Sequence, residues 1–73
     1  MDVYEFNKNS VEKVKITLQE FKGHKLLDIR VYYEKDKNEF LPTKRGISLS
    51  LDLLSELLAG IKKVKGNIEG DIK

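Results

Sequence analysis

The chain has 73 residues, of which 36% are charged and 40% hydrophobic, and a formal net charge of +2. A chain of this size buries only about 60% of its unfolded surface, so its own core is marginal. It has no cysteine and a single histidine, which excludes a disulfide framework, a catalytic thiolate and the usual multi-ligand metal sites. We expect one domain over 1–73 without metal or cofactor, with a core at about 11–65 and flexible or peripheral segments at 1–10 and 66–73.

The basic residues are concentrated in the middle of the chain. Between Lys13 and Arg45 there are nine basic and five acidic residues, which gives +4 for this stretch, while the two ends together carry −2. This distribution favours an anionic partner. No run is long enough to span a membrane, and the opening residues, with Asp2 and Glu5, are unlike a signal peptide. We therefore expect an intracellular protein that does not contact membranes.

The first 21 residues predict a turn and one clear strand. Val3, Tyr4 and Phe6 could form a short leading strand before a turn at 7–10. Residues 11–21 then alternate, which predicts a strand with one core-facing side and one basic side. The core-facing side carries Val14, Ile16 and Leu18. The other side carries Lys13, Lys15, Thr17, Gln19 and Phe21.

Phe21 has two interpretations. An exposed ring costs hydration unless it binds something. Alternatively the ring folds over a sheet edge and is largely buried, which the sequence alone favours because isolated exposed apolar residues are common and need no function. After it, Lys22-Gly23-His24 predict a tight turn in which Gly23 is free to adopt a positive φ.

Residues 25–33 give the clearest strand signal in the chain. Apolar residues alternate with Asp28 and Arg30, and no Gly or Pro interrupts them. The apolar set is Leu27, Ile29 and Val31. The polar side therefore carries a cation at Arg30, with the rings of Tyr32 and Tyr33 at the end of the strand. Such a face suits single-stranded nucleic acid, because phosphates meet cations and bases meet rings.

The next segments are short. Residues 34–38 predict a charged, solvated loop, residues 39–41 a short strand, and Pro42-Thr43 a turn. Residues 47–49 alternate as a final strand. Gly46 at its start predicts a bulge or a close backbone approach.

A helix closes the chain. Ser50 is a suitable N-cap, Asp52 suits the helix dipole, and Gly66 can end the helix. Its apolar surface is wider than one stripe, so one side can cover the sheet and the other can bind a second copy. The apolar set is Leu51, Leu53, Leu54, Leu57, Leu58, Ile61 and Val64. We expect a homodimer whose interface lies on the side of Leu54, Leu58 and Ile61 or on the side of Leu53 and Leu57.

The sequence contains no enzyme motif. Its glycines do not have the spacing of a phosphate-binding loop. His24 has no serine or cysteine partner that a motif would select. Asp36 and Glu39 lie in a lysine-rich loop, where ion pairing explains them. We expect a protein that is not an enzyme.

Several segments occur in the order and spacing of a known family. They are Phe21-Lys22-Gly23, Leu27-Asp28-Ile29-Arg30, Tyr32-Tyr33, Pro42 and Lys44-Arg45-Gly46-Ile47-Ser48-Leu49-Ser50. With them, the stretch from about Lys13 to Val64 resembles the single-stranded-DNA-binding domain of the transcriptional coactivator family called positive cofactor four. The resemblance implies an α+β fold, in which a curved four-stranded antiparallel sheet is followed by one C-terminal helix and pairs into a symmetric homodimer.

The resemblance also implies a function and a site. Members bind single-stranded or melted DNA with little sequence preference, using two stacking aromatics and basic backbone contacts. By position Phe21 matches the first aromatic, and Tyr33 matches the second, which is commonly Trp. The basic contact positions are matched by Lys22, His24, Arg30, Lys44 and Arg45, to which the basic strand face adds Lys13 and Lys15.

The alternation of apolar and polar residues and the resemblance to the family disagree about the second stacking aromatic. Alternation places Tyr33 on the apolar side, opposite Arg30. Either a bulge near Val31 turns Tyr33 outward, or Tyr32 is the ring that stacks. We follow the resemblance and predict Tyr33.

We therefore predict a homodimeric single-stranded-DNA-binding protein that acts in transcription or in DNA replication, recombination or repair. The alternatives are a coactivator-like adaptor for transcription or replication proteins, and RNA binding, because stacking surfaces discriminate poorly without a 2′-hydroxyl contact. The chain lacks the serine-rich acidic extension of the eukaryotic coactivator, which favours a bacterial or phage member. Its location is then cytoplasmic and nucleoid-associated, or nuclear if the source is eukaryotic.

Overall fold

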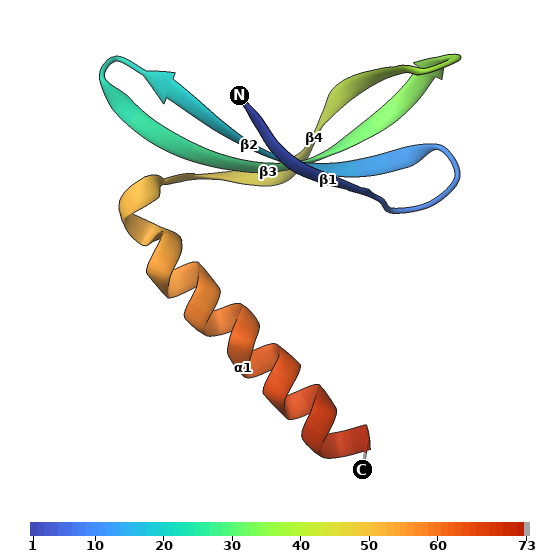
Figure 1. The fold of residues 1–73 in the computed structure, drawn as a ribbon. Coiled ribbons are helices and arrows are strands. Elements are labelled where there is room, and N and C mark those ends of the chain that lie inside the picture. The colour runs from blue at the N-terminus through green and yellow to red at the C-terminus, as the bar shows by residue number, and fades with distance from the viewer. Residues whose placement is uncertain (73) are drawn as a thin grey trace.

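The computed structural model describes the backbone of residues 1–72 and the side chains of residues 1–68. Four antiparallel strands in the order β1-β2-β3-β4 are followed by a short 3-10 helix and one α-helix (Figure 1). The elements are β1 (Asp2–Asn7), β2 (Glu12–Phe21), β3 (His24–Asp36), β4 (Glu39–Ser50), η1 (Leu51–Leu53) and α1 (Leu54–Ile72). The predicted α+β fold, a four-stranded sheet followed by one C-terminal helix, is confirmed.

Short turns connect the strands where the sequence predicts them. The β2–β3 hairpin has a two-residue turn in which Lys22 and Gly23 have φ of 52° and 80°. Positive φ at both central residues is the geometry of a type I′ turn, whose twist matches that of the strands. The β1–β2 turn is held by Asn9, whose side-chain oxygen accepts hydrogen bonds from the backbone N–H groups of Val11 and Glu12.

The four strands are not the four that the sequence predicted. The segments 39–41 and 47–49 belong to one continuous strand, β4. The uncertain leading strand is β1, which pairs with β2 apart from a register shift between Asp2 and Tyr4. Pro42 does not break β4, because β4 is an edge strand and the missing N–H can face outward. The predicted loop at 34–38 is also reduced, since β3 continues to Asp36 and the turn contains only residues 37–38.

Gly46 combines both features predicted for it. The β3–β4 register shifts between Arg30 and Tyr32, so β4 carries a bulge beside Gly46. A Cβ added to Gly46 would lie 2.4 Å from the carbonyl oxygen of Ile29. Only glycine therefore allows β4 to approach β3 this closely.

The helix runs further than the sequence predicted. It continues through Gly66 to Ile72, because a glycine inside a helix costs only about 1 kcal/mol and ends it only when the next residues turn away. Residue 73 lies outside the described residues. That segments 1–10 and 66–73 are peripheral to the core stays a prediction. Among the described residues, no helix is both long and apolar enough to cross a membrane.

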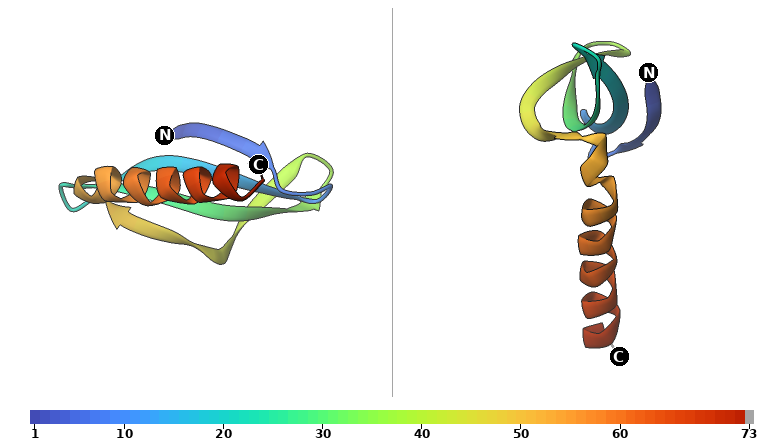
Figure 2. Two further views of the ribbon diagram at one scale, coloured as in Figure 1. Left: turned by 90° about the horizontal axis from the view of Figure 1, so that it is seen from below. Right: turned by 90° about the vertical axis from the view of Figure 1, so that its left-hand side faces the viewer.

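The helix does not cover the sheet. It leaves the end of β4 and projects away from the strands, as Figures 1 and 2 show. The expectation that one side of α1 packs on its own sheet is therefore wrong for the single chain. The physical reason is the connection: η1 follows Ser50 directly, so no loop is available to turn the helix back. The apolar side chains of Leu54, Leu58, Ile61 and Val64 are consequently exposed.

Strand register divides the sheet into two faces. The basic face carries Lys13, Lys15, Thr17, Phe21, Asp28, Arg30, Tyr32 and Phe40. The apolar face carries Tyr4, Phe6, Val14, Ile16, Leu18, Leu27, Ile29, Val31, Tyr33, Leu41, Ile47 and Leu49. The β2–β3 and β3–β4 hairpins bend away from α1 (Figure 1), so the sheet has a concave side remote from the helix and a convex side towards it.

Burial follows this curvature. Thr17 and Asp28, opposite each other on β2 and β3, are only 4% and 5% exposed although they lie on the basic face. Side chains converge on a concave surface, so we assign the basic face to the concave side. The prediction that Thr17 and Asp28 face solvent is thus wrong. On the apolar face Leu27, which pairs with Leu49, is the only buried hydrophobic residue among those described, with 6% exposed.

Candidate nucleic-acid interface

The centre of the basic face is a forked ion pair. The Nε and Nη2 atoms of Arg30 donate to the two carboxylate oxygens of Asp28 at 3.1 and 3.0 Å, and its Nη1 donates to the Thr43 carbonyl at 3.0 Å. Hydrogen bonding to Asp28 raises the pKa of Arg30 above its ordinary value. Arg30 is therefore a fixed, half-buried cation whose charge is largely balanced by Asp28.

Two lysines on β2 lie over aromatic rings. The Lys15 ammonium is 4.6 Å from the centroid of the Tyr32 ring, and the Lys13 ammonium is 4.6 Å from that of Phe40. Both distances are within the range of a cation–π interaction. Lys13 also forms an ion pair of 2.8 Å with Glu5, which lowers the pKa of that carboxyl. Cations and rings thus lie within reach of each other on the basic face, as the sequence predicts.

The β2–β3 hairpin carries the predicted turn residues. Phe21 is 61% exposed, so the expectation that it folds over the sheet edge is wrong. Phe21 is the last residue of β2, directly before the two-residue turn, and its partner across the hairpin is His24. The ammonium of Lys22 lies 5.3 Å from the ring centroid. Phe21, Lys22 and His24 therefore form an exposed end to the basic face.

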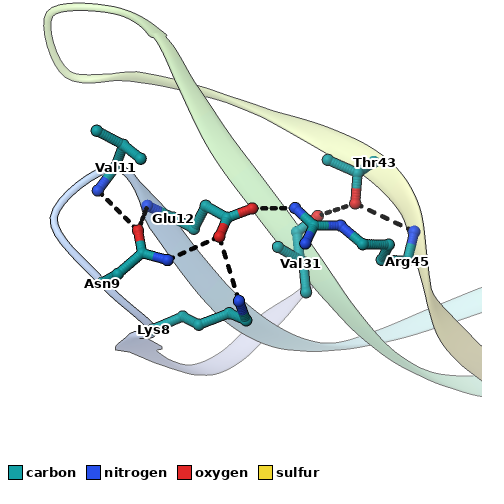
Figure 3. A network of polar contacts seen from close by, with 7 residues as sticks. All are labelled: Lys8, Asn9, Val11, Glu12, Val31, Thr43 and Arg45. Atoms are coloured by element: carbon teal, nitrogen blue, oxygen red, sulfur yellow. Dashed lines mark hydrogen bonds and ion pairs between the residues drawn. The ribbon is translucent and has the colours of Figure 1, made fainter.

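Arg45 is turned away from this face. Its guanidinium donates to Glu12 on the apolar face, and Glu12 also accepts from Asn9 at 2.7 Å and Lys8 at 3.2 Å (Figure 3). Hydrogen bonds from Asn9, Arg45 and Lys8 lower the pKa of Glu12 to about 2. This network connects the β1–β2 turn to β4.

The bulge in β4 explains the different surroundings of Lys44 and Arg45. The Thr43 hydroxyl donates to the Val31 carbonyl at 2.8 Å and accepts from the Arg45 backbone N–H at 3.1 Å (Figure 3). This local bonding replaces regular ladder pairing between Pro42 and Gly46. Lys44 is exposed, and none of the ion pairs among the described side chains includes it.

Tyr32 and Tyr33 lie on opposite faces. The β2–β3 register is continuous from Glu12 paired with Tyr33 to Phe21 paired with His24. Tyr33 therefore shares the apolar face with Val31, while Tyr32 shares the basic face with Arg30. The bulge near Val31 lies in β4 rather than β3, so it does not turn Tyr33 onto the basic face.

Sequence reasoning missed Phe40 as a part of this face. Its strand was predicted to be three residues long, too short to show on which face the ring lies. Phe40 contacts Lys13, which is distant in the sequence, through the pairing of three strands. Among the described residues no cluster of three or more His, Cys, Asp or Glu could hold a metal ion.

The comparison with known protein families covers the region that builds the basic face and the start of α1. Residues 8–60 match the family model described as Transcriptional Coactivator p15 (PC4). The chain belongs to the PC4 family. This confirms the resemblance drawn from the segments between Phe21 and Ser50.

Curated relatives in the PC4 family are eukaryotic coactivators. The chain is 45% identical over 62 residues to the RNA polymerase II transcriptional coactivator KELP of Arabidopsis thaliana, covering 85% of this chain and 34% of that protein. It is 43% identical over 54 residues to the RNA polymerase II transcriptional coactivator of Drosophila melanogaster, covering 74% and 48%. The chain thus spans less than half the length of these relatives.

Solved PC4-family structures share the fold. A PC4 homolog from Burkholderia pseudomallei has a TM-score of 0.84 at 22% identity, covering 89% of this chain and 96% of that one. The bacteriophage T5 homolog, implicated in recombination-dependent DNA replication, has a TM-score of 0.77 at 25% identity, covering 94% and 80%. A MoSub1–ssDNA complex has a TM-score of 0.61 at 27% identity, covering 92% and 77%.

Proposed function

We propose that this chain binds single-stranded DNA on its basic face without reading sequence, as a homodimer and without catalysis. The observation that carries the proposal is that two lysines each lie over an aromatic ring on the basic face of the sheet. Lysines attract the phosphates, and rings offer π-faces on which bases of any identity stack. The MoSub1–ssDNA complex and the phage T5 homolog's implication in DNA replication support this function for the shared fold.

The binding residues follow from the two groups of side chains on this face. The centre contributes Lys13, Lys15, Arg30 and Tyr32, and the hairpin end contributes Phe21, Lys22 and His24. Lys44 adds an exposed cation on β4. The sequence resemblance assigns Arg45 and Tyr33 to DNA binding. In the structure both lie towards the apolar face, so in this proposal they contact DNA only if the strand extends past the edge of β4.

The dimer is supported by apolar surface that one chain leaves uncovered. Residues of α1 such as Leu54, Leu58 and Ile61 are exposed, Leu57 is half-buried, and most of the apolar sheet face is only half-buried. A shallow hollow of about 280 Å³ on that face is lined by Val14, Val31 and Ile47 among others. Apolar surface of this extent favours association. A second copy of α1 offers side chains of suitable size to fill the hollow.

The experiment is a titration of single- and double-stranded oligonucleotides of equal length, repeated over a salt series. Single strands should bind more tightly, because stacking needs unpaired bases. The slope of log K against log salt should flatten by about 0.7 when Lys15→Gln or Lys44→Gln removes a phosphate contact. Equal affinity for both forms, with an unchanged slope in both variants, would refute DNA binding by this face.

A second candidate function has its own support. The curated relatives are named transcriptional coactivators, which favours an adaptor role towards transcription proteins in addition to DNA binding. Failure of the purified chain to bind any oligonucleotide, DNA or RNA, would favour this role alone. The source and compartment of the protein stay predictions: cytoplasmic for a bacterial or phage member, nuclear for a eukaryotic one.

A further inference from the structure

We propose that Phe40 and Tyr32, with Lys13 and Lys15, form a subsite that stacks two bases next to each other at the β3–β4 end of the basic face. The inference rests on the proposed binding of single-stranded DNA. It adds stacking rings to Phe21 and Tyr33, the pair that the sequence resemblance selects. Phe40 is the new member of the site.

Strand register brings the two rings together. Tyr32 lies opposite Pro42, and Phe40, two residues earlier on β4, lies opposite Glu34. Tyr32 and Phe40 are therefore diagonal neighbours on one face, at a spacing of about 7–8 Å between backbone positions. Aromatic side chains reach across such a distance. Both residues are half-buried, so neighbouring residues hold each ring while part of it remains accessible.

Each ring is matched to its own lysine. Lys13 lies over Phe40 and Lys15 over Tyr32, both at 4.6 Å, and the two lysines are two residues apart on the same face of β2. The two ammonium groups are therefore arranged along the face in the same order as the two rings. A single strand laid along this face meets two cations and two rings in matched order.

Binding requires each ammonium to exchange partners. In the free protein the ammonium occupies the ring face that a base needs. A lysine ammonium is a point charge on a flexible four-carbon stem, so it can move to a phosphate while the base takes its place on the ring. Lys13 must also leave Glu5, with which it forms an ion pair. The pairs therefore hold cation and ring beside each other before DNA arrives.

The test compares Phe40→Leu with Phe6→Leu. The second variant is a matched control, because Phe6 is an exposed ring on the apolar face of β1. Both variants and the unaltered protein are titrated with labelled oligo-dT and with an abasic strand of the same length. Phe40→Leu should weaken oligo-dT binding about 5- to 150-fold, the range for loss of one stacked base, without changing abasic binding. Phe6→Leu should bind both strands like the unaltered protein.

The two proposals fail in different ways. If the unaltered protein binds the abasic strand as tightly as oligo-dT, bases do not stack on the protein. The base-stacking part of the proposed function is then wrong. If oligo-dT is preferred, but Phe40→Leu binds like the control while Phe21→Leu is weakened, the subsite is wrong and the function stands.

A measurement on the unaltered protein covers the case in which Phe40→Leu does not fold. A strand carrying 5-iodouracil is photocrosslinked to the protein, and the crosslinked peptides are identified by mass spectrometry. Crosslinks at Phe40 and Tyr32 are expected. Crosslinks confined to Phe21 and Tyr33 would overturn the subsite.

Discussion

The two faces of the sheet differ in how far contacts within one chain bury or pair their side chains. On the basic face Asp28 and Thr17 are buried, Arg30 is held by three hydrogen bonds, and each lysine of β2 has a ring beside it. On the apolar face only Leu27 is buried, and the helix that could cover the rest projects away. A single chain thus provides partners for the polar side chains of its basic face. It leaves much of its apolar surface uncovered, and that surface is available for association. Four comparisons of variants test this difference, in order of decreasing expected effect.

The largest effect is expected from Leu58→Lys on α1. If dimerisation buries Leu58 in both copies, the variant loses about 1.5–3 kcal/mol per side chain, or about 3–6 kcal/mol per dimer, before the cost of burying a charge. We expect a monomer with much reduced thermal stability at tens of micromolar, measured by sedimentation and thermal melting.

Ser55→Lys provides the matched control for that experiment. It introduces the same charge at an exposed polar position of α1, and the dimer should persist. A monomeric unaltered protein at tens of micromolar, or a dimeric Leu58→Lys, would contradict association through this surface.

The next effect is expected from Arg30→Met on the basic face. Removing the guanidinium leaves the buried Asp28 carboxylate without the partner that compensates its lost hydration. Thermal stability should fall further than in Lys44→Met, which removes an exposed cation. Adding Asp28→Asn to Arg30→Met should restore part of the loss, because the unpaired charge is removed. No recovery in the double variant would show that the buried carboxylate is not the cause.

A third comparison concerns the two adjacent tyrosines. The register places Tyr32 on the basic face and Tyr33 on the apolar face, so Tyr32→Leu should weaken single-strand binding by about 1–3 kcal/mol and Tyr33→Leu by less. The salt slope should be unchanged in both variants, because a neutral ring releases no counterions. A larger loss for Tyr33→Leu would show that the position in the family motif outweighs the face.

The smallest effect is expected from Glu12→Gln in the network at the β1–β2 turn. The pKa of Glu12 is lowered from 4.5 to about 2, so the folded state binds its proton less readily than the unfolded state. The stabilisation is therefore complete above about pH 4.5 and is lost as pH falls towards 2. Melting temperatures between pH 2 and 5 should vary less in Glu12→Gln than in the unaltered protein. Glu56→Gln, at an exposed carboxylate of α1, should keep the original pH dependence.

Much of this architecture is determined by local sequence. Alternation in β2 and β3 fixes which side chains share a face, and the Lys22-Gly23 turn fixes the pairing of these strands, because a two-residue hairpin leaves no freedom of register. The same alternation places Tyr32 beside Arg30. The exposure of Phe21 is an exception, because alternation assigns the ring to a face but does not show whether other side chains cover it.

Other features depend on contacts between distant segments. The continuity of β4 through Pro42 depends on its position at the sheet edge, and the burial of Asp28 depends on curvature that gathers side chains on the concave side. Neither is visible in a window of adjacent residues. The contact between Lys13 and Phe40 likewise requires three paired strands.

The sequence by itself therefore determined that several strands precede a single helix, that basic and apolar residues separate in β2 and β3, and that the helix carries an excess of apolar surface. The tertiary structure decided where the helix points, which charges are already neutralised, and which rings meet which lysines. The reason is that periodicity and turn geometry act over a few residues, whereas curvature, register across several strands and ion pairing act between residues that the chain brings together only when it folds.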